Sequence, residues 1–137
     1  MAWLASFTDF EQTKPEALRR SVTDLSRIRR LLRALDEPQE AFRSIHITGS
    51  KGKGTTTIIL DAILRAHGLS TGRYLSPHLV RVNERISVNG RDIADREFAD
   101  RVDELGPYVD ECRKQRPDDV PSFFECATAM AFLEFRR

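Results

Sequence analysis

The fold of this chain is decided by the stretch SIHITGSKGKGTTTIIL, residues 44–60. Its first part, residues 44–48, is short and rich in β-branched side chains, which favours a strand. Three glycines and two lysines follow in residues 49–54. Apolar residues then recur at helical spacing from Thr55 to His67, and Gly68 is a helix stop signal. A strand, a glycine loop and a helix in this order are typical of a site for nucleotide phosphates.

The glycine cluster has the chemistry of a phosphate cradle. Glycines allow successive backbone N–H groups to turn toward one anion, and the N-terminus of the following helix adds positive partial charge. Lys53 can reach the β- and γ-phosphates, and the hydroxyl of Thr55 is the one nearest to a bound Mg²⁺. The spacing differs from the commonest phosphate loop, GxxxxGK[ST], because Thr55 follows Gly54. A glycine-rich turn with a solvated lysine is the alternative interpretation.

The flanking sequence predicts an α/β fold. Residues 71–75 read as a second strand, so the order strand, helix, strand indicates a parallel sheet. We expect further helices over residues 24–35, over 95–112 and from Ser122 to the C-terminus, and a turn at Asn89-Gly90. The prediction is a mostly parallel sheet flanked by helices, in one domain of residues 1–137. Two readable strands are too few for a complete sheet of this kind, so we expect the N-terminal part of a longer protein.

Composition narrows the class of protein. The chain has 137 residues, of which 40% are hydrophobic and 31% charged, as in globular proteins in water. The apolar runs are too short to cross a membrane, so we expect no membrane partner. Net charge is only +1, yet residues 41–91 carry eight Lys or Arg against two acids, which favours a local anionic ligand over nucleic acid. Two separate cysteines, Cys112 and Cys126, indicate packing roles and a cytoplasmic location.

Three segments resemble one known family. Residues 46–56 resemble the phosphate loop of the folylpolyglutamate synthase and dihydrofolate synthase family, a branch of the Mur ligase superfamily. Residues 74–86, YLSPHLVRVNERI, resemble that family's second signature. The residues Ser122-Phe123-Phe124-Glu125, at the start of an alanine-rich helix, resemble its third. The similarity extends over residues 24–135, in the family's order and spacing.

The resemblance implies the N-terminal part of a Mur-ligase-like ATPase domain, with ATP and Mg²⁺ as cofactors. It implies an amide ligase that phosphorylates a carboxylate of dihydropteroate or of a folate and then joins L-glutamate to it. The implied roles are ATP binding by the phosphate loop, with Lys53 also catalytic, Mg²⁺ binding by Ser76, and contact with the pterin by the third signature. The residues concerned are Gly49, Ser50, Lys51, Gly52, Lys53, Gly54 and Thr55 for ATP, Ser76 for Mg²⁺, and Ser122, Phe123, Phe124 and Glu125 for the pterin.

Other interpretations of these segments stay open at this stage. Ser76-Pro77 also reads as a turn that ends a strand, and Ser122 with Glu125 also reads as a capping box. A Mur-type ligase for a peptidoglycan precursor and a non-catalytic nucleotide-binding module are the alternative functions. The family's C-terminal glutamate ligase domain and its magnesium-binding carboxylate and histidine would lie beyond Arg137. We therefore expect this chain, a monomer with small-molecule partners, to be inactive on its own.

Overall fold

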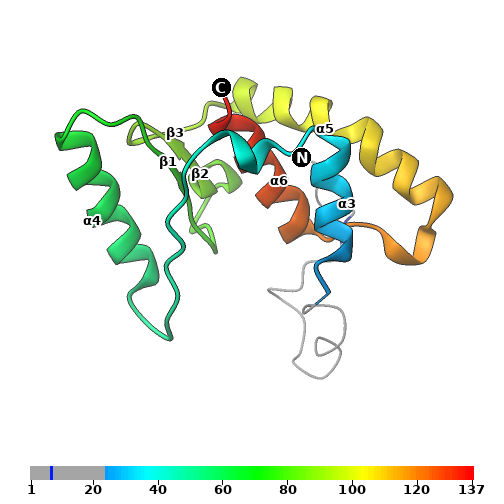
Figure 1. Ribbon diagram of the computed structural model, residues 1–137, viewed down its shortest axis with the longest axis horizontal. Coiled ribbons are helices and arrows are strands. Elements are labelled where there is room, and N and C mark those ends of the chain that lie inside the picture. Colours follow the sequence, from blue (N-terminus) through cyan, green and yellow to red (C-terminus); the bar gives the residue numbers. More distant parts are fainter. Residues whose placement is uncertain (1–6, 8–23) are drawn as a thin grey trace.

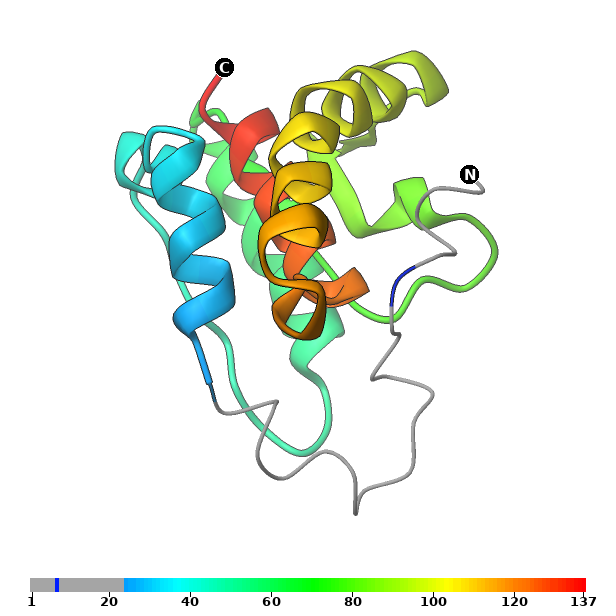
Figure 2. The same ribbon diagram turned by 90° about the vertical axis from the view of Figure 1, so that its right-hand side faces the viewer.

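Three helices form a packed cluster in the computed structural model, which describes Phe7 and residues 24–137. They are α3 (Ser26–Ala34), α5 (Asp95–Gln115) and α6 (Phe123–Phe135). Both α3 and α5 pack against α6, and α6 also contacts the first strand of the sheet. Figure 1 shows α6 between the strands on one side and α3 on the other, and Figure 2 shows α5 crossing α6. Short 3-10 helices at Pro38–Ala41, Val82–Arg85 and Pro117–Asp119 connect these elements.

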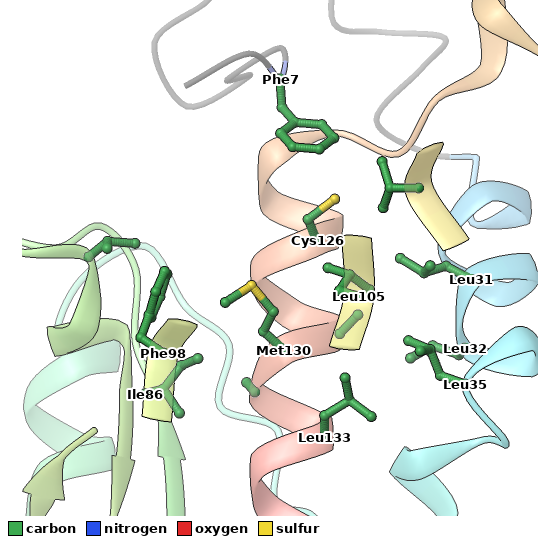
Figure 3. Close-up of a cluster of buried hydrophobic side chains, with 14 of the residues drawn as sticks. Phe7, Leu31, Leu32, Leu35, Ile86, Phe98, Leu105, Cys126, Met130 and Leu133 are labelled. Atoms are coloured by element: carbon green, nitrogen blue, oxygen red, sulfur yellow. The ribbon is translucent and has the colours of Figure 1, made fainter. Parts of the chain in front are cut away.

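The core is built around α6 because this helix is apolar on nearly every side. A helix of that kind is stable only when neighbours cover it all round. In Figure 3, Met130 and Leu133 of α6 lie between Ile86 and Phe98 on one side and the leucines of α3 on the other. The buried hydrophobic cluster includes Leu31, Leu32, Leu35, Ile86, Phe98, Leu105, Val109, Cys126, Ala129, Met130, Ala131 and Leu133.

The strands form a small antiparallel sheet in the order β1 (Gly72–Tyr74), β2 (Ile86–Val88) and β3 (Arg91–Asp92). The turn between β2 and β3 has positive φ at both central residues, 51° at Asn89 and 80° at Gly90. Asn-Gly is the favoured pair for such a turn, since both residues tolerate that backbone region. The expected turn and the expected strand near residues 71–75 are confirmed.

The strand expected at residues 44–48, and its parallel pairing with the second strand, are not present in the part of the chain that the structure describes. Residues 43–49 have no regular secondary structure, and both pairings of β1, β2 and β3 are antiparallel. The β-branched side chains of residues 44–48 fit a strand, but a strand also needs a neighbour that accepts and donates its backbone hydrogen bonds. Among the described residues, none pairs with this segment, and the side chain of Ile45 is exposed.

Helix α4 (Lys53–Ala66) stands apart from the helical cluster and makes its main contact with β1. Its buried residue is Asp61, whereas Ile58, Ile59 and Ile63 are each about half exposed, at 46%, 55% and 50%. The apolar side of this helix is therefore open to solvent in the described part of the chain. The other expected helices are confirmed with small changes in their ends, and α5 runs three residues further than predicted, to Gln115.

The ring of Phe7 is buried at the end of the core, near Cys126 in Figure 3. The guanidinium of Arg113 lies 4.6 Å from its ring centroid. Within Phe7 and residues 24–137, no helix combines the length and the apolar character that a membrane span requires.

Candidate functional site

The glycine loop leads directly into α4, as the sequence predicts. Gly49 and Gly52 have φ of 152° and 77°, and Gly52 is the N-cap of the helix. A φ of 77° is left-handed backbone, which glycine adopts without the strain that a Cβ would cause. In Figure 1 this loop is the turn at the free end of α4, away from the sheet.

Lys53 folds back across the loop that precedes it. Its Nζ donates a hydrogen bond to the carbonyl oxygen of Gly49 at 2.7 Å, so the ammonium group lies over the loop. The first backbone hydrogen bond of α4 runs from the N–H of Thr56 to the oxygen of Gly52, at 2.9 Å. The preceding N–H groups of a helix have no acceptor within it, and they lie at its positive end. No acidic residue stands in the first turn of α4. The loop therefore offers the ammonium group of Lys53 and several N–H donors to an anion.

A buried carboxylate fastens α4 to the sheet. Asp61 accepts a hydrogen bond from the hydroxyl of Thr71 at 2.5 Å and pairs with Arg65 at 3.3 Å and with Arg73 at 3.4 Å. Burial of a carboxylate is tolerated when cations and donors surround it. These contacts relate α4, the helix that follows the glycine loop, to β1, the strand that ends just before Ser76.

The loop that carries Ser76, residues 75–85 between β1 and β2 (the Ser76 loop), is organised by Glu84. Its carboxylate accepts hydrogen bonds from the N–H groups of Leu79 at 2.8 Å, Val80 at 3.1 Å and Arg81 at 2.7 Å. The bonds from Leu79 and Arg81 are the main cause that lowers the pKa of Glu84 below its ordinary value of 4.5. Ser76 itself is exposed at the start of this loop.

The third segment caps α6. The hydroxyl of Ser122 accepts a hydrogen bond from the N–H of Glu125 at 3.3 Å, and Glu125 Oε2 accepts one from the N–H of Ser122 at 2.8 Å. The Nε of Arg27 in α3 is 3.3 Å from Oε1 and 3.2 Å from Oε2 of the same carboxylate. The capping box is thus present, and the carboxylate of Glu125 is occupied by Arg27 and Ser122.

The two phenylalanines of this segment differ in exposure and in their partners. Phe124 is 40% exposed, and its ring centroid is 6.1 Å from that of Tyr74, the last residue of β1. Phe123 is half-buried, and the guanidinium of Arg85 lies 5.0 Å from its ring centroid. The structure therefore brings the third segment to the two ends of the Ser76 loop, at Tyr74 and Arg85.

The structure brings some of the expected site residues together and leaves others apart. The Ser76 loop and the aromatic pair lie side by side, whereas the described contacts of residues 49–55 are within their own loop and helix. Sequence reasoning missed Arg27, Asp61, Glu84 and Arg85 as residues that organise the site. Glu84 and Arg85 lie within the second signature, residues 74–86, so the sequence already indicated that they belong near the site. Nothing in the sequence distinguishes Arg27 and Asp61, because many charged residues in this chain occur at helical spacing.

Comparisons with known proteins address identity directly. No family model matches the sequence. A dihydrofolate synthase/folylpolyglutamate synthase of Bacillus subtilis is 38% identical over 111 residues, which cover 81% of this chain and 26% of that protein. The structure of folylpolyglutamate synthetase from Lactobacillus casei matches with a TM-score of 0.82 and 33% identity, over 98% of this chain and 32% of the other. A complex of FPGS with AMPPCP and folate matches with a TM-score of 0.83 and 33% identity, over 98% of this chain and 31% of that one.

These matches identify the α/β fold as that of a Mur-ligase-like protein. The chain belongs to the folylpolyglutamate synthase and dihydrofolate synthase family. It spans about a quarter of the length of the curated bacterial relatives that it matches.

Proposed function

We propose that this chain supplies the nucleotide and pterin sites of an ATP-dependent amide ligase. The reaction is the addition of L-glutamate to dihydropteroate, to the terminal glutamate of a folate, or to both. A carboxylate oxygen of the acceptor attacks the γ-phosphorus of ATP, and ADP leaves. The amine of L-glutamate then attacks the acyl phosphate, and inorganic phosphate leaves as the amide forms. The single observation that carries the proposal is the glycine loop at the N-terminus of α4, over which Lys53 bonds to the carbonyl oxygen of Gly49, in a chain of this family.

The phosphate loop accounts for the first step. In the structure the Nζ of Lys53 is bonded to a neutral carbonyl oxygen, that of Gly49. A phosphate oxygen is a stronger, charged acceptor, so ATP exchanges this bond for an ion pair. Backbone N–H groups of residues 49–55 hold the remaining phosphate oxygens, and the charge that develops on the transferring group is stabilised in place. Lys51 adds a second cation beside them.

Mg²⁺ is the expected companion of the nucleotide. Within the described residues, no group of three His, Cys, Asp or Glu side chains could hold a metal ion by itself. Mg²⁺ in phosphoryl-transfer sites keeps several waters and phosphate oxygens as ligands, so it needs few protein ligands. The exposed hydroxyl of Ser76 fits that requirement as one ligand. When bound, the ion neutralises charge on the phosphates.

The aromatic segment fits the pterin. Phe124 is 40% exposed and lies beside Tyr74, so its ring offers a surface on which a flat heterocycle can stack. The neighbouring Phe123 packs against the guanidinium of Arg85. Ser122 and Glu125 belong to the same site through the cap that fixes where α6 begins, since both are buried and bonded to each other.

The organisation of the whole ligase is part of the proposal. Residues 1–137 form one portion of the ATP-binding domain, and a separate glutamate ligase domain completes the site. The alternative of a peptidoglycan-precursor ligase is not favoured, because the relatives carry folate ligase names. The protein's expected monomeric state and cytoplasmic location stay predictions.

The test is an assay of the complete product of the reading frame with ATP, Mg²⁺ and L-glutamate. Dihydropteroate and tetrahydrofolate are offered separately, and mass spectrometry follows the addition of one glutamyl residue together with the release of ADP. Lys53→Met is expected to raise the Kd for the ATP analogue AMPPCP by about tenfold to a hundredfold, since it removes a charge-assisted bond worth roughly 1.5–3 kcal/mol. Lys114→Met, the same change at an exposed residue of α5, is the matched control. ATP binding without product from either acceptor would favour a non-catalytic module.

A further inference from the structure

Arg85 occupies an unusual place for an arginine. It ends the 3-10 helix Val82–Arg85, directly before β2, and only 2% of the residue is exposed. An arginine is rarely buried to this extent unless its guanidinium has specific partners. Two of its side-chain partners are His78, in the Ser76 loop, and Phe123, at the beginning of α6.

Arg85 closes the Ser76 loop in two ways. Its carbonyl oxygen accepts a hydrogen bond from the N–H of Leu75 at 2.9 Å, which joins the two ends of the loop next to Ser76. Its side-chain Nε donates to Nδ1 of His78 at 2.9 Å, within the loop. This bond requires a lone pair on Nδ1, so the neutral imidazole of His78 carries its proton on Nε2.

The same guanidinium lies over an aromatic ring of α6. Its central carbon is 5.0 Å from the centroid of Phe123, a distance at which a cation is attracted to a ring face. The flat guanidinium can make this contact and the in-plane bond to His78 at once. A lysine cannot reproduce both, because its ammonium is a single point of charge.

We propose that Arg85 is a positioning residue that holds the Ser76 loop and Phe123 in one fixed arrangement. This inference rests on the proposed function, in which Ser76 serves the nucleotide and the phenylalanines serve the pterin. Arg85 acts through His78 and Phe123. Its loss therefore disturbs both subsites together, although neither subsite contains Arg85.

The chain offers a matched control four positions away. Arg81 stands in the same loop, but its side chain is 60% exposed and pairs with Asp95 on the outside. The backbone bond from Arg81 to Glu84 does not depend on its side chain. Arg81→Met therefore removes an arginine from the loop without removing a contact to His78 or Phe123.

The first experiment does not depend on catalysis. Protein labelled with ¹⁵N-histidine and with ¹³C in the phenylalanine rings is compared by NMR as wild type, Arg85→Met, Arg85→Lys and Arg81→Met. We expect the Nδ1 signal of His78 in the wild type to show an acceptor nitrogen and the Nε2–H tautomer. In both Arg85 variants it should shift toward a mixture of tautomers, with a simultaneous change at Phe123, and Arg81→Met should match the wild type. Unchanged His78 and Phe123 signals in folded Arg85→Met would overturn the proposal.

The second experiment measures kinetics of the complete product of the reading frame. Arg85→Met should raise KM for the pterin substrate and KM for MgATP, each by about tenfold. Phe123→Leu should raise KM for the pterin alone, and KM for MgATP should change by less than about twofold. A merely structural role would reduce the folded fraction, which lowers apparent kcat and leaves both KM values unchanged, and that pattern would overturn the proposal. A wild type without ligase activity would refute the proposed function instead, and the NMR result would then decide the role of Arg85.

Discussion

The guanidinium of Arg27 in α3 meets the carboxylate of Glu125 in α6, with Nε 3.2 Å from Oε2, although the residues are 98 positions apart. Their side chains are only 13% and 12% exposed. The pair therefore lies largely out of water, where the loss of one partner leaves the other charge poorly solvated. It fixes α3 to the first turn of α6, directly beside the two phenylalanines.

Glu125→Gln should consequently lower stability. Glutamine can still accept the bond from the N–H of Ser122, but it cannot neutralise Arg27, so we expect a loss of roughly 1–3 kcal/mol in urea unfolding. The matched control is Glu97→Gln. Glu97 accepts the N–H of Ala94 at 2.5 Å and pairs with Arg91, in the first turn of α5, but this pair is more exposed. That change should cost less than about 0.5 kcal/mol. Equal losses for the two variants would show that burial of the Arg27 pair adds nothing.

Position 72 should not tolerate any residue with a Cβ atom. A Cβ at this position would lie 2.3 Å from Cδ1 of Phe135, so the ring that packs α6 on β1 would have to move. We expect Gly72→Ala to lower the free energy of unfolding by about 1–3 kcal/mol. Gly106→Ala, in the middle of α5 with no atom within 4 Å of the new Cβ, should instead add up to about 1 kcal/mol. Adding Phe135→Leu to Gly72→Ala should recover part of the loss, and failure to do so would place the strain elsewhere.

The Ser76 loop should loosen in acid. The pKa of Glu84 is lowered from 4.5 by the N–H bonds of Leu79 and Arg81, so the ionised carboxylate is the form that holds the loop. The stabilisation is present above pH 4.5 and is lost as the pH falls through the lower folded-state pKa. Amide ¹H shifts of Leu79 and Arg81 should titrate with a common midpoint below 4.5. In Glu84→Gln this transition should be absent, and a midpoint at or above 4.5 would contradict the assignment.

The two cysteines should differ in reactivity. Burial, with a smaller contribution from the charge of Glu125, raises the pKa of the Cys126 thiol to about 12, whereas Cys112 is half-buried. At pH 8 Cys126 therefore has almost no thiolate, which is the reactive form. Iodoacetamide and peptide mass spectrometry should show modification of Cys112 first, with Cys126 modified at a comparable rate only in urea. Early modification of Cys126 in the folded protein would mean that the helical cluster opens readily.

The sequence by itself determined the elements whose signals are local. The glycine loop before α4, the Asn89-Gly90 turn and the Ser122 cap each depend on backbone preferences of a few adjacent residues, and each was predictable. The family resemblance could likewise be recognised from the sequence, because its three signatures are short segments that follow one another along the chain.

Only the tertiary structure decided which distant groups meet. The antiparallel pairing of β1 with β2 and the lack of a partner for residues 44–48 depend on which strands are neighbours, and a period of two in the side chains does not encode this. The contacts of Arg27 with Glu125 and of Arg85 with Phe123 likewise depend on how α3, the Ser76 loop and α6 pack. Charged residues at helical spacing look alike in the sequence, and burial in the folded core selects the few that must be paired.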